Sequence, residues 1–146
     1  MPAAEITLNG QATITSPLLL AETVMMLGMT KLQLARIPLE RVLEKAAARN
    51  RRTGANGSRE PAQANCLTDL IVALQTAERF LLRRDTCLLR SLALHAMLAR
   101  RKLPATLVFG VKLHPFEAHC WVQRGQTLVN DTVERVGLFV PIRAVT

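Results

Sequence analysis

Three side chains in the second half of the chain have the chemical types that thiol acyl transfer needs. They are Cys87, His119 and Asp131. In that reaction a thiolate attacks a carbonyl carbon, an imidazole transfers the proton, and a carboxylate orients the imidazole and stabilises its charged form. The competing interpretation is that Cys87 is one more small, buried residue of an apolar helix. Which interpretation holds depends on the elements that position the three residues.

Cys87 is expected in the first turn of a helix. The residues from 88 to 99 are apolar at helical spacing, over a run too long for one strand. Asp85 or Thr86 can act as the N-cap, and the basic run at 100–102 falls in the last turn, where cations suit the helix dipole. The free N–H groups and partial positive charge of a helix N-terminus favour a thiolate. Three arginines add positive charge nearby: Arg83, Arg84 and Arg90.

His119 and Asp131 are expected on the two strands of a hairpin. Residues 117–123 and 127–133 are short, strand-like runs, and the three residues 124–126, with a central glycine, are a common hairpin loop. A loop of that length places His119 directly opposite Asp131, with both side chains on one face. A slip of one residue would break this pairing.

The same hairpin predicts where the neighbouring side chains point. Cys120 and Asn130 should face away from His119, whereas Trp121 shares its face and would shield the His–Asp pair from water or simply pack in the core. A zinc site made of Cys87, His119 and Cys120 is disfavoured, because adjacent strand residues point to opposite faces and the chain has no CxxC pair.

The other two histidines are poorer candidates for the base. His95 follows Cys87 by eight residues on the same helix, which separates them by roughly 12 Å along the axis, so we expect a core histidine. His114 lies before Pro115 in a loop and is expected to face solvent.

Three segments resemble the protease half of the lasso-peptide B proteins. They are CLLRSLALHAMLARRKLPATLVFGV from Cys87, PFEAHCWV around His119, and the aspartate after the hairpin, with a looser match at LARIPLERVLEKAAA. The resemblance implies a transglutaminase-like, papain-related fold and removal of the leader from a ribosomally made precursor peptide (a RiPP). It implies Cys87, His119 and Asp131 as the catalytic residues. Cys120 stands where that family usually has a small residue, often alanine.

The resemblance also implies partners. Lasso B proteins occur fused to a small winged-helix-like leader-binding domain or split from it, and the first 80 residues here do not have that pattern. We therefore expect the split form, which acts on a lasso precursor with a separate leader-binding (RiPP recognition element) protein and a macrolactam-forming cyclase. Some family members need ATP for the combined reaction, but we assign no cofactor and no ATP site to this chain.

The order of elements predicts an α+β fold, papain-like or transglutaminase-like, with helices first and a small antiparallel sheet after them. We expect one domain over 1–146, mainly helical over 1–82 and catalytic over 83–146. A short strand is expected within the first fifteen residues. The predicted helices are 17–37, from 39 to about 50, 62–82, and the cysteine helix. The predicted strands are 105–113, 117–123, 127–133, and an edge strand within 137–145, since Pro141 excludes a central one.

Composition places the chain among folded proteins of a reducing compartment. Hydrophobic residues make up 49% of it, enough for a core, and the odd number of cysteines, three, does not suggest a disulfide framework. We therefore expect a cytoplasmic protein. The apolar run at 17–29 is too short to span a bilayer and lacks a basic leading region. It predicts a buried helix, with a membrane-surface role as the alternative.

The net charge of +8 leaves a second class of function open. Basic residues concentrate at 31–59 and 79–102, so a helical nucleic-acid-binding module is the alternative to an enzyme. The absence of interleaved aromatic residues and of a zinc-finger pattern counts against it, and we expect no nucleic acid among the partners. Within enzymes, another thiol acyltransferase or amidohydrolase would use the same residues through the same thioester.

Overall fold

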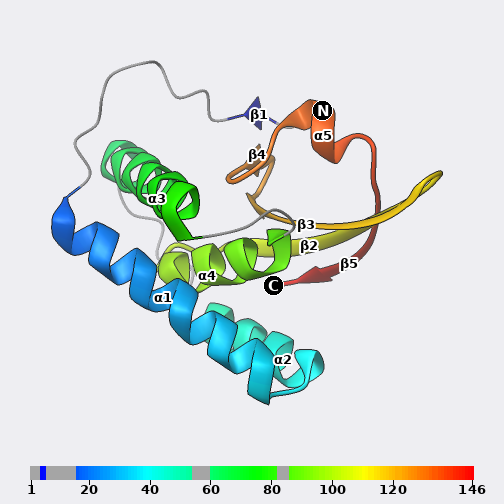
Figure 1. Cartoon of the computed structure of the whole chain (residues 1–146). Coiled ribbons are helices and arrows are strands. Elements are labelled where there is room, and N and C mark those ends of the chain that lie inside the picture. Colours follow the sequence, from blue (N-terminus) through cyan, green and yellow to red (C-terminus); the bar gives the residue numbers. More distant parts are fainter. Residues whose placement is uncertain (1–3, 6–15, 54–59, 82–85) are drawn as a thin grey trace.

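The computed structural model describes residues 4–5, 16–53, 60–81 and 86–146. Four helices precede most of a sheet, which confirms the predicted α+β arrangement (Figure 1). The helices are α1 (Pro17–Arg36), α2 (Leu39–Arg51), α3 (Glu60–Leu81), α4 (Cys87–Arg100) and the short α5 (Val133–Val136). The strands are β1 (Ala4–Glu5), β2 (Thr106–Leu113), β3 (Phe116–Arg124), β4 (Thr127–Leu128) and β5 (Val140–Val145).

The sheet has five strands in the order β1-β4-β3-β2-β5. The pairs among β2, β3, β4 and β5 are antiparallel, and β1 joins β4 in parallel. Strand β5 lies at the edge, as the proline at 141 predicts, because a proline has no backbone N–H to donate to a ladder. The expected strand near the N-terminus is present at Ala4–Glu5, and the rest of that prediction falls outside the described residues.

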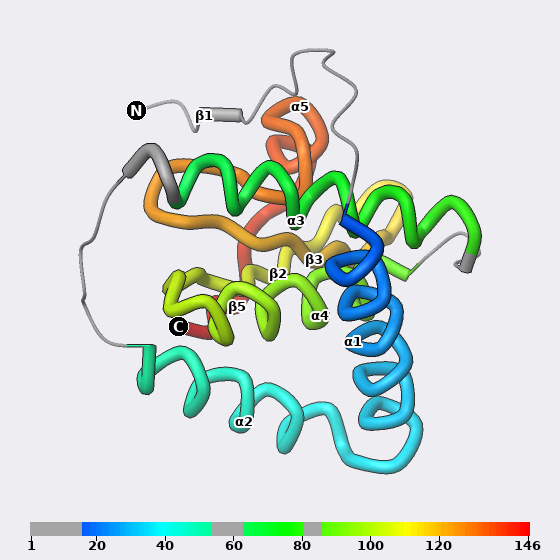
Figure 2. The backbone as a smooth tube through the Cα atoms, turned by 90° about the vertical axis from the view of Figure 1, so that its left-hand side faces the viewer, coloured from blue at the N-terminus to red at the C-terminus, as the bar shows by residue number. Residues whose placement is uncertain are grey.

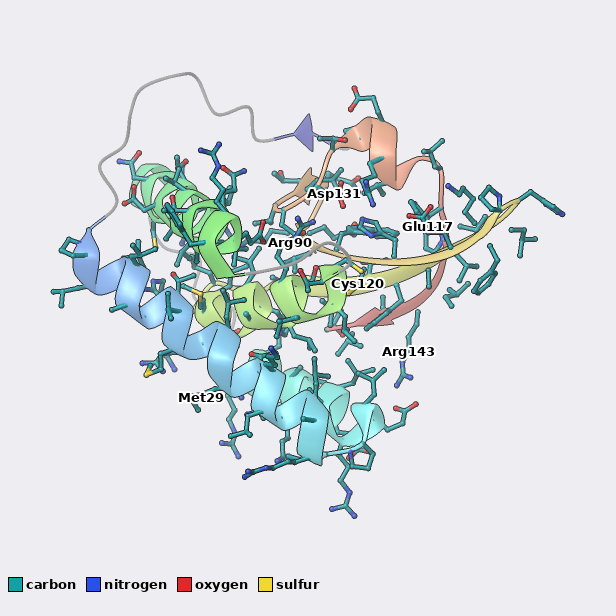
Figure 3. The ribbon with its side chains drawn as sticks, viewed as in Figure 1. Met29, Arg90, Glu117, Cys120, Asp131 and Arg143 are labelled. Atoms are coloured by element: carbon teal, nitrogen blue, oxygen red, sulfur yellow. The ribbon has the colours of Figure 1, made fainter. Side chains whose placement is uncertain are left out.

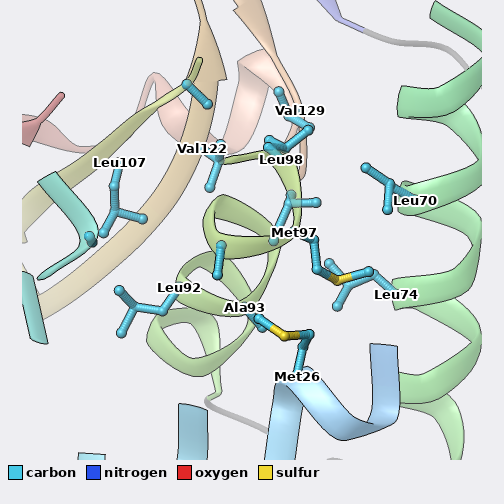
Figure 4. Packing of buried hydrophobic residues seen from close by; sticks show 14 of the residues in the cluster. Met26, Leu70, Leu74, Leu92, Ala93, Met97, Leu98, Leu107, Val122 and Val129 are labelled. Carbon is cyan, nitrogen blue, oxygen red and sulfur yellow. The ribbon is translucent and has the colours of Figure 1, made fainter. Parts of the chain in front are cut away.

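Helix α4 is the centre of the hydrophobic core. Ten of its fourteen residues are buried, so it is covered on nearly every side. Figure 4 shows its residues Leu92, Ala93, Met97 and Leu98 between the other helices and the sheet. The partners labelled there are Met26 of α1, Leu70 and Leu74 of α3, Leu107 of β2, Val122 of β3 and Val129. The helix that begins with Cys87 is therefore held rigidly against β3.

Helices α1 and α2 cover α4 on the side away from the sheet (Figure 2). The proline at 38 separates them, as its ring prevents continuation of a helix. The prediction of a buried helix at the N-terminal end is only half right. Four residues of α1 are buried, while several of its large apolar side chains are exposed. By length and composition α1 is also apolar enough to cross a membrane, as a core helix or a signal sequence can be.

The predicted hairpin register is wrong. Arg124 pairs with Thr127, so the turn has two residues, Gly125 and Gln126, instead of three. Gly125 has a φ of 57°, a conformation that glycine adopts without steric cost. The second strand is also much shorter than the expected 127–133, since it ends at Leu128 and a helix begins at Val133.

The hydrogen-bond ladder between β3 and β4 ends early because the side chain of Asn130 takes the place of a backbone acceptor. The Oδ1 atom of Asn130 accepts a hydrogen bond of 2.8 Å from the Val122 N–H, where a strand would have supplied a carbonyl. The segment that follows is thereby released from the strand register and carries Asp131 toward β3 by another route.

Candidate active site

The sulfur-bearing residue begins the central helix. Cys87 is the first residue of α4, after the N-cap Thr86, and its side chain is half-buried. The hydroxyl of Thr86 makes no capping hydrogen bond. The amides of the first turn of an α-helix have no intrahelical acceptor, so the N-terminal end of α4 presents donors beside the thiol. This placement agrees with the sequence prediction.

The structure brings His119 and Asp131 together despite the changed register. His119 lies on β3 and is 4% exposed, and its Nε2 donates to Asp131 Oδ2. The other carboxylate oxygen, Oδ1, accepts from the Thr132 N–H at 2.8 Å. With both oxygens engaged, the carboxylate has one orientation. Because Nε2 faces Asp131, Nδ1 is the ring nitrogen left for a hydrogen bond to Cys87.

Electrostatic shifts identify Cys87 and His119 as a coupled pair. The hydrogen bond to His119 lowers the pKa of Cys87 against the opposing effect of burial, helped by the N–H groups of Cys120 and Leu88. The hydrogen bond to Asp131, and then that to Cys87, raises the pKa of His119 to about 9. These directions favour a thiolate beside an imidazolium at neutral pH.

The carboxylate stays ionised in the same surroundings. Burial acts to raise the pKa of Asp131, but the hydrogen bonds from His119 and from the Thr132 N–H, with nearby positive charge, lower it overall. An ionised carboxylate against Nε2–H is the state that orients an imidazole.

Two aromatic rings enclose the imidazole. The centroid of Trp121 lies 6.0 Å from that of His119, and the centroid of Phe139 lies 4.9 Å away. Trp121 is 1% exposed and lies beside His119, a placement that fits both core packing and shielding of the imidazole from water. Opposite His119 is Gly110, where a Cβ would come within 2.8 Å of the Trp121 ring. Sequence reasoning missed Phe139, because nothing in the pattern of the tail shows which strand it reaches.

A buried polar network ties together the three segments that carry Cys87, His119 and Asp131. Ser91, one turn after Cys87 on α4, is fully buried, and its Oγ donates to the Cys120 carbonyl at 3.0 Å. Asn130 Nδ2 donates to Ser91 Oγ at 2.9 Å. As expected, Cys120 faces away from His119 and packs toward α4. The sequence signal was available: a serine inside an apolar helix must find a partner.

Arg90 of α4 also contacts the segment that carries Asp131. Its guanidinium donates to the Asn130 carbonyl at 3.3 Å and lies 3.5 Å from Glu78 of α3. Figure 3 shows Arg90 between α4 and the segment that carries Asp131. Burial raises the pKa of the Glu78 carboxyl. Arg90 contributes to the lowered pKa of Asp131, whereas the other two arginines predicted near the thiol lie outside the described residues.

The remaining candidates have structural explanations. His95 is buried, its Nε2 lies 3.1 Å from the Ala105 carbonyl oxygen, and burial lowers its pKa, as suits a core histidine. His114 is exposed between β2 and β3. Burial raises the pKa of the Cys120 thiol to about 12, so it stays protonated. Within the described ranges no group of three or more His, Cys, Asp or Glu residues could hold a metal ion.

Comparisons with known proteins give the family of the chain. The family model described as the transglutaminase-like superfamily matches residues 27–144, a range that contains Cys87, His119 and Asp131. The microcin J25-processing protein McjB of Escherichia coli is 42% identical over 48 residues. That match covers 33% of this chain and 23% of the relative, so it spans less than a quarter of the relative's length. No solved structure matches the chain.

Proposed function

Because the chain belongs to the transglutaminase-like superfamily, we propose that it is a cysteine peptidase that removes the leader from a lasso-peptide precursor. The observation that carries the proposal is the arrangement of His119, which bonds Asp131 through Nε2 and is the main cause of the lowered pKa of Cys87 at the N-terminus of α4. The substrate class is supported by the similarity of a 48-residue segment to a microcin-processing protein.

The proposed reaction follows acyl transfer through a thioester. The Cys87 thiolate attacks the carbonyl carbon at the end of the leader, and the N–H of Cys87 is placed to donate to the developing oxyanion. The His119 imidazolium gives its proton to the departing amine, which leaves as the new N-terminus of the core peptide. His119 then removes a proton from water, which hydrolyses the thioester, while Asp131 holds the imidazole in one orientation.

The chain is proposed to act in the cytoplasm with separate proteins. A leader-binding protein would present the precursor, and a cyclase would close the macrolactam on the amine that cleavage releases. The peptidase step needs no cofactor, because thiolate, imidazole and carboxylate supply the nucleophile, the proton transfer and the orientation.

Mass spectrometry of a lasso precursor tests the proposal. The precursor is incubated with the leader-binding protein and wild-type chain, Cys87→Ala or Cys66→Ala, the last being a half-buried cysteine on α3. We expect leader loss with wild type and with Cys66→Ala, and none with Cys87→Ala. Cleavage by Cys87→Ala would remove the cysteine from the mechanism.

Transamidation is the second candidate, favoured by the superfamily to which the chain belongs. The same thioester would then be resolved by an amine instead of water. An added primary amine that appears covalently on the leader's C-terminus would identify it, whereas a free carboxylate identifies hydrolysis.

A further inference from the structure

One flank of α1 exposes a row of large apolar side chains. They are Leu18, Met25, Met29 and Leu32, which are 48% to 82% exposed. Successive spacings of seven, four and three residues place them on a single stripe along the helix. We call this row the α1 stripe. Figure 3 shows Met29 projecting from α1 on the side away from the sheet. Exposed apolar surface of this kind marks sites of association.

A hollow adjoins the stripe where α1, α2 and α4 meet, and Met29 lies on its edge. We call it the three-helix hollow. Its volume is about 160 Å³, close to the roughly 150 Å³ of an apolar cavity that binds benzene. The buried apolar residues lining it are Met26, Val42, Ala46, Leu92 and Ala96. It therefore has the size and lining for one aromatic ring or branched aliphatic side chain.

The rest of the lining is polar and consists of Thr30 and Gln33 of α1 and three cations. Lys45 and Arg49 of α2 and Arg100 of α4 line it. Arg100 lies 3.6 Å from Glu22 of α1. Within the part of the chain that the structure describes, neither Lys45 nor Arg49 has an ion pair. The hollow thus offers two positive charges that are not neutralised, beside a place for one apolar group.

We propose that the α1 stripe and the three-helix hollow form a docking site for an acidic segment of a partner polypeptide. The segment inserts one large apolar side chain into the hollow, lays further apolar residues along the stripe, and places carboxylates beside Lys45 and Arg49. Such a buried anchor with a charged rim is how protein interfaces obtain affinity and specificity.

Charge and shape distinguish this occupant from two others. A second copy of the chain carries the same net charge of +8, which opposes its association with a basic rim. A bilayer surface offers no single side chain to fill a hollow between three helices. The site also lies apart from the thiol, since Cys87 does not line the hollow and the nearest lining residue on α4, Leu92, follows it by five residues, roughly 7.5 Å along the helix. Occupation would leave Cys87 free, so the docking site does not depend on the proposed reaction.

Binding of a synthetic probe tests the proposal without any cleavage assay. The probe is a fluorescein-labelled peptide of Glu, Ala and Leu with one Phe, its apolar residues at helical spacing, and the comparison peptide has Lys in place of every Glu. We expect fluorescence anisotropy to show binding of the acidic peptide only. Lys45→Glu should weaken it about tenfold, as reversal of a rim charge replaces an attraction by a repulsion. Met29→Ser should weaken it to a similar degree.

Lys31→Glu is the matched control, because it makes the same charge change on α1 two residues after Met29, about 200° around the helix. It should change the affinity of the acidic peptide less than twofold, because a charge on the far side of α1 is remote from the peptide and screened by salt. Methionine-methyl NMR of the complex should show shifts at Met26 and Met29 but not at Met97, which does not line the hollow.

Four results would overturn the proposal. The first is equal weakening by Lys45→Glu and Lys31→Glu, and the second is equal binding of the Lys and Glu peptides. The third is a concentration-dependent dimer abolished by Met29→Ser, which would assign the stripe to a second copy. The fourth is binding to phosphatidylserine vesicles without binding to the acidic peptide, which would assign it to a membrane surface.

Discussion

His119 is the residue on which the proposed chemistry depends, because it meets both of the other groups. Asp131 bonds one ring nitrogen, and Cys87 shares a hydrogen bond with the ring. The first contact is the largest cause of the raised pKa of His119, and the second lowers the pKa of the thiol. The thiolate and the imidazolium therefore coexist over a range that ends at about pH 9, where His119 loses its proton.

Asp131→Asn should shift the pH range over which the thiolate and the imidazolium coexist, and it should also slow the reaction. Removal of the carboxylate takes away the main cause that raises the pKa of His119, so the imidazolium deprotonates at lower pH. The alkaline limb of the pH–rate profile for leader cleavage should shift toward acid, and kcat/KM should fall roughly a hundredfold or more.

The matched control is Glu134→Gln, which neutralises an exposed carboxylate three residues along the chain, on α5. It should leave both the rate and the alkaline limb in place. An alkaline limb that stays at about pH 9 in Asp131→Asn would mean that Asp131 does not set the protonation of His119.

Among the elements, the contact between α4 and β3 is fixed by a polar network as well as by apolar packing. Ser91→Ala removes the acceptor for Asn130 Nδ2 and the donor to the Cys120 carbonyl. Two buried groups lose partners, so the free energy of unfolding should fall by about 1–3 kcal/mol, measured by urea denaturation.

The same change should also slow alkylation of Cys87 under conditions where the protein stays folded, because α4 loses its tie to the histidine strand. Thr76→Ala is the control, since the Thr76 hydroxyl donates only within α3, to the Val72 carbonyl. If Ser91→Ala and Thr76→Ala have the same effect on alkylation, the network stabilises the fold without positioning the thiol.

Replacement of glycine by alanine should have opposite effects on stability at Gly110 of β2 and Gly28 of α1. Gly110→Ala would place a Cβ 2.8 Å from the Trp121 ring and 3.0 Å from the Cβ of Phe139. Trp121 and Phe139 are the two residues whose rings enclose His119. Overpacking of that kind should destabilise the fold by about 1–3 kcal/mol. Gly28→Ala in α1 meets nothing within 4 Å and should stabilise by about 0.5–1 kcal/mol, through helix propensity.

Thermal unfolding of the two variants measures the difference directly. A Gly110→Ala protein as stable as wild type, with unchanged cleavage, would show that the ring enclosure around His119 has room to adjust.

At the scale of the molecule, the features predicted correctly are those that local patterns determine. Helical apolar spacing predicted α1 to α4, the proline at 38 predicted the break between α1 and α2, and the proline at 141 predicted an edge strand. The structure brings Cys87, His119 and Asp131 together, and their assignment as catalytic residues, made by type and by family resemblance, stays a prediction. The single-domain organisation over 1–146 stays a prediction.

The errors arose where tertiary contacts override local patterns. The hairpin register depended on a turn that uses the positive φ of Gly125 and on Asn130, whose side chain ends the ladder. Asp131 nevertheless reaches His119, by a loop and not by strand pairing. Helix α5 has four residues and none is buried, so it has no apolar periodicity to detect. The exposed flank of α1 was missed because an apolar run does not say what covers it.

The most direct test of the central claim is the rate at which each cysteine of the native protein reacts with iodoacetamide at neutral pH, followed by peptide mapping. We predict that Cys87 is modified fastest, since His119 lowers its pKa, that buried Cys120 stays unmodified, and that His119→Ala slows Cys87 to the rate of half-buried Cys66. If Cys87 in the wild-type protein reacts no faster than Cys66, the thiol is not activated, and the assignment of a cysteine peptidase fails.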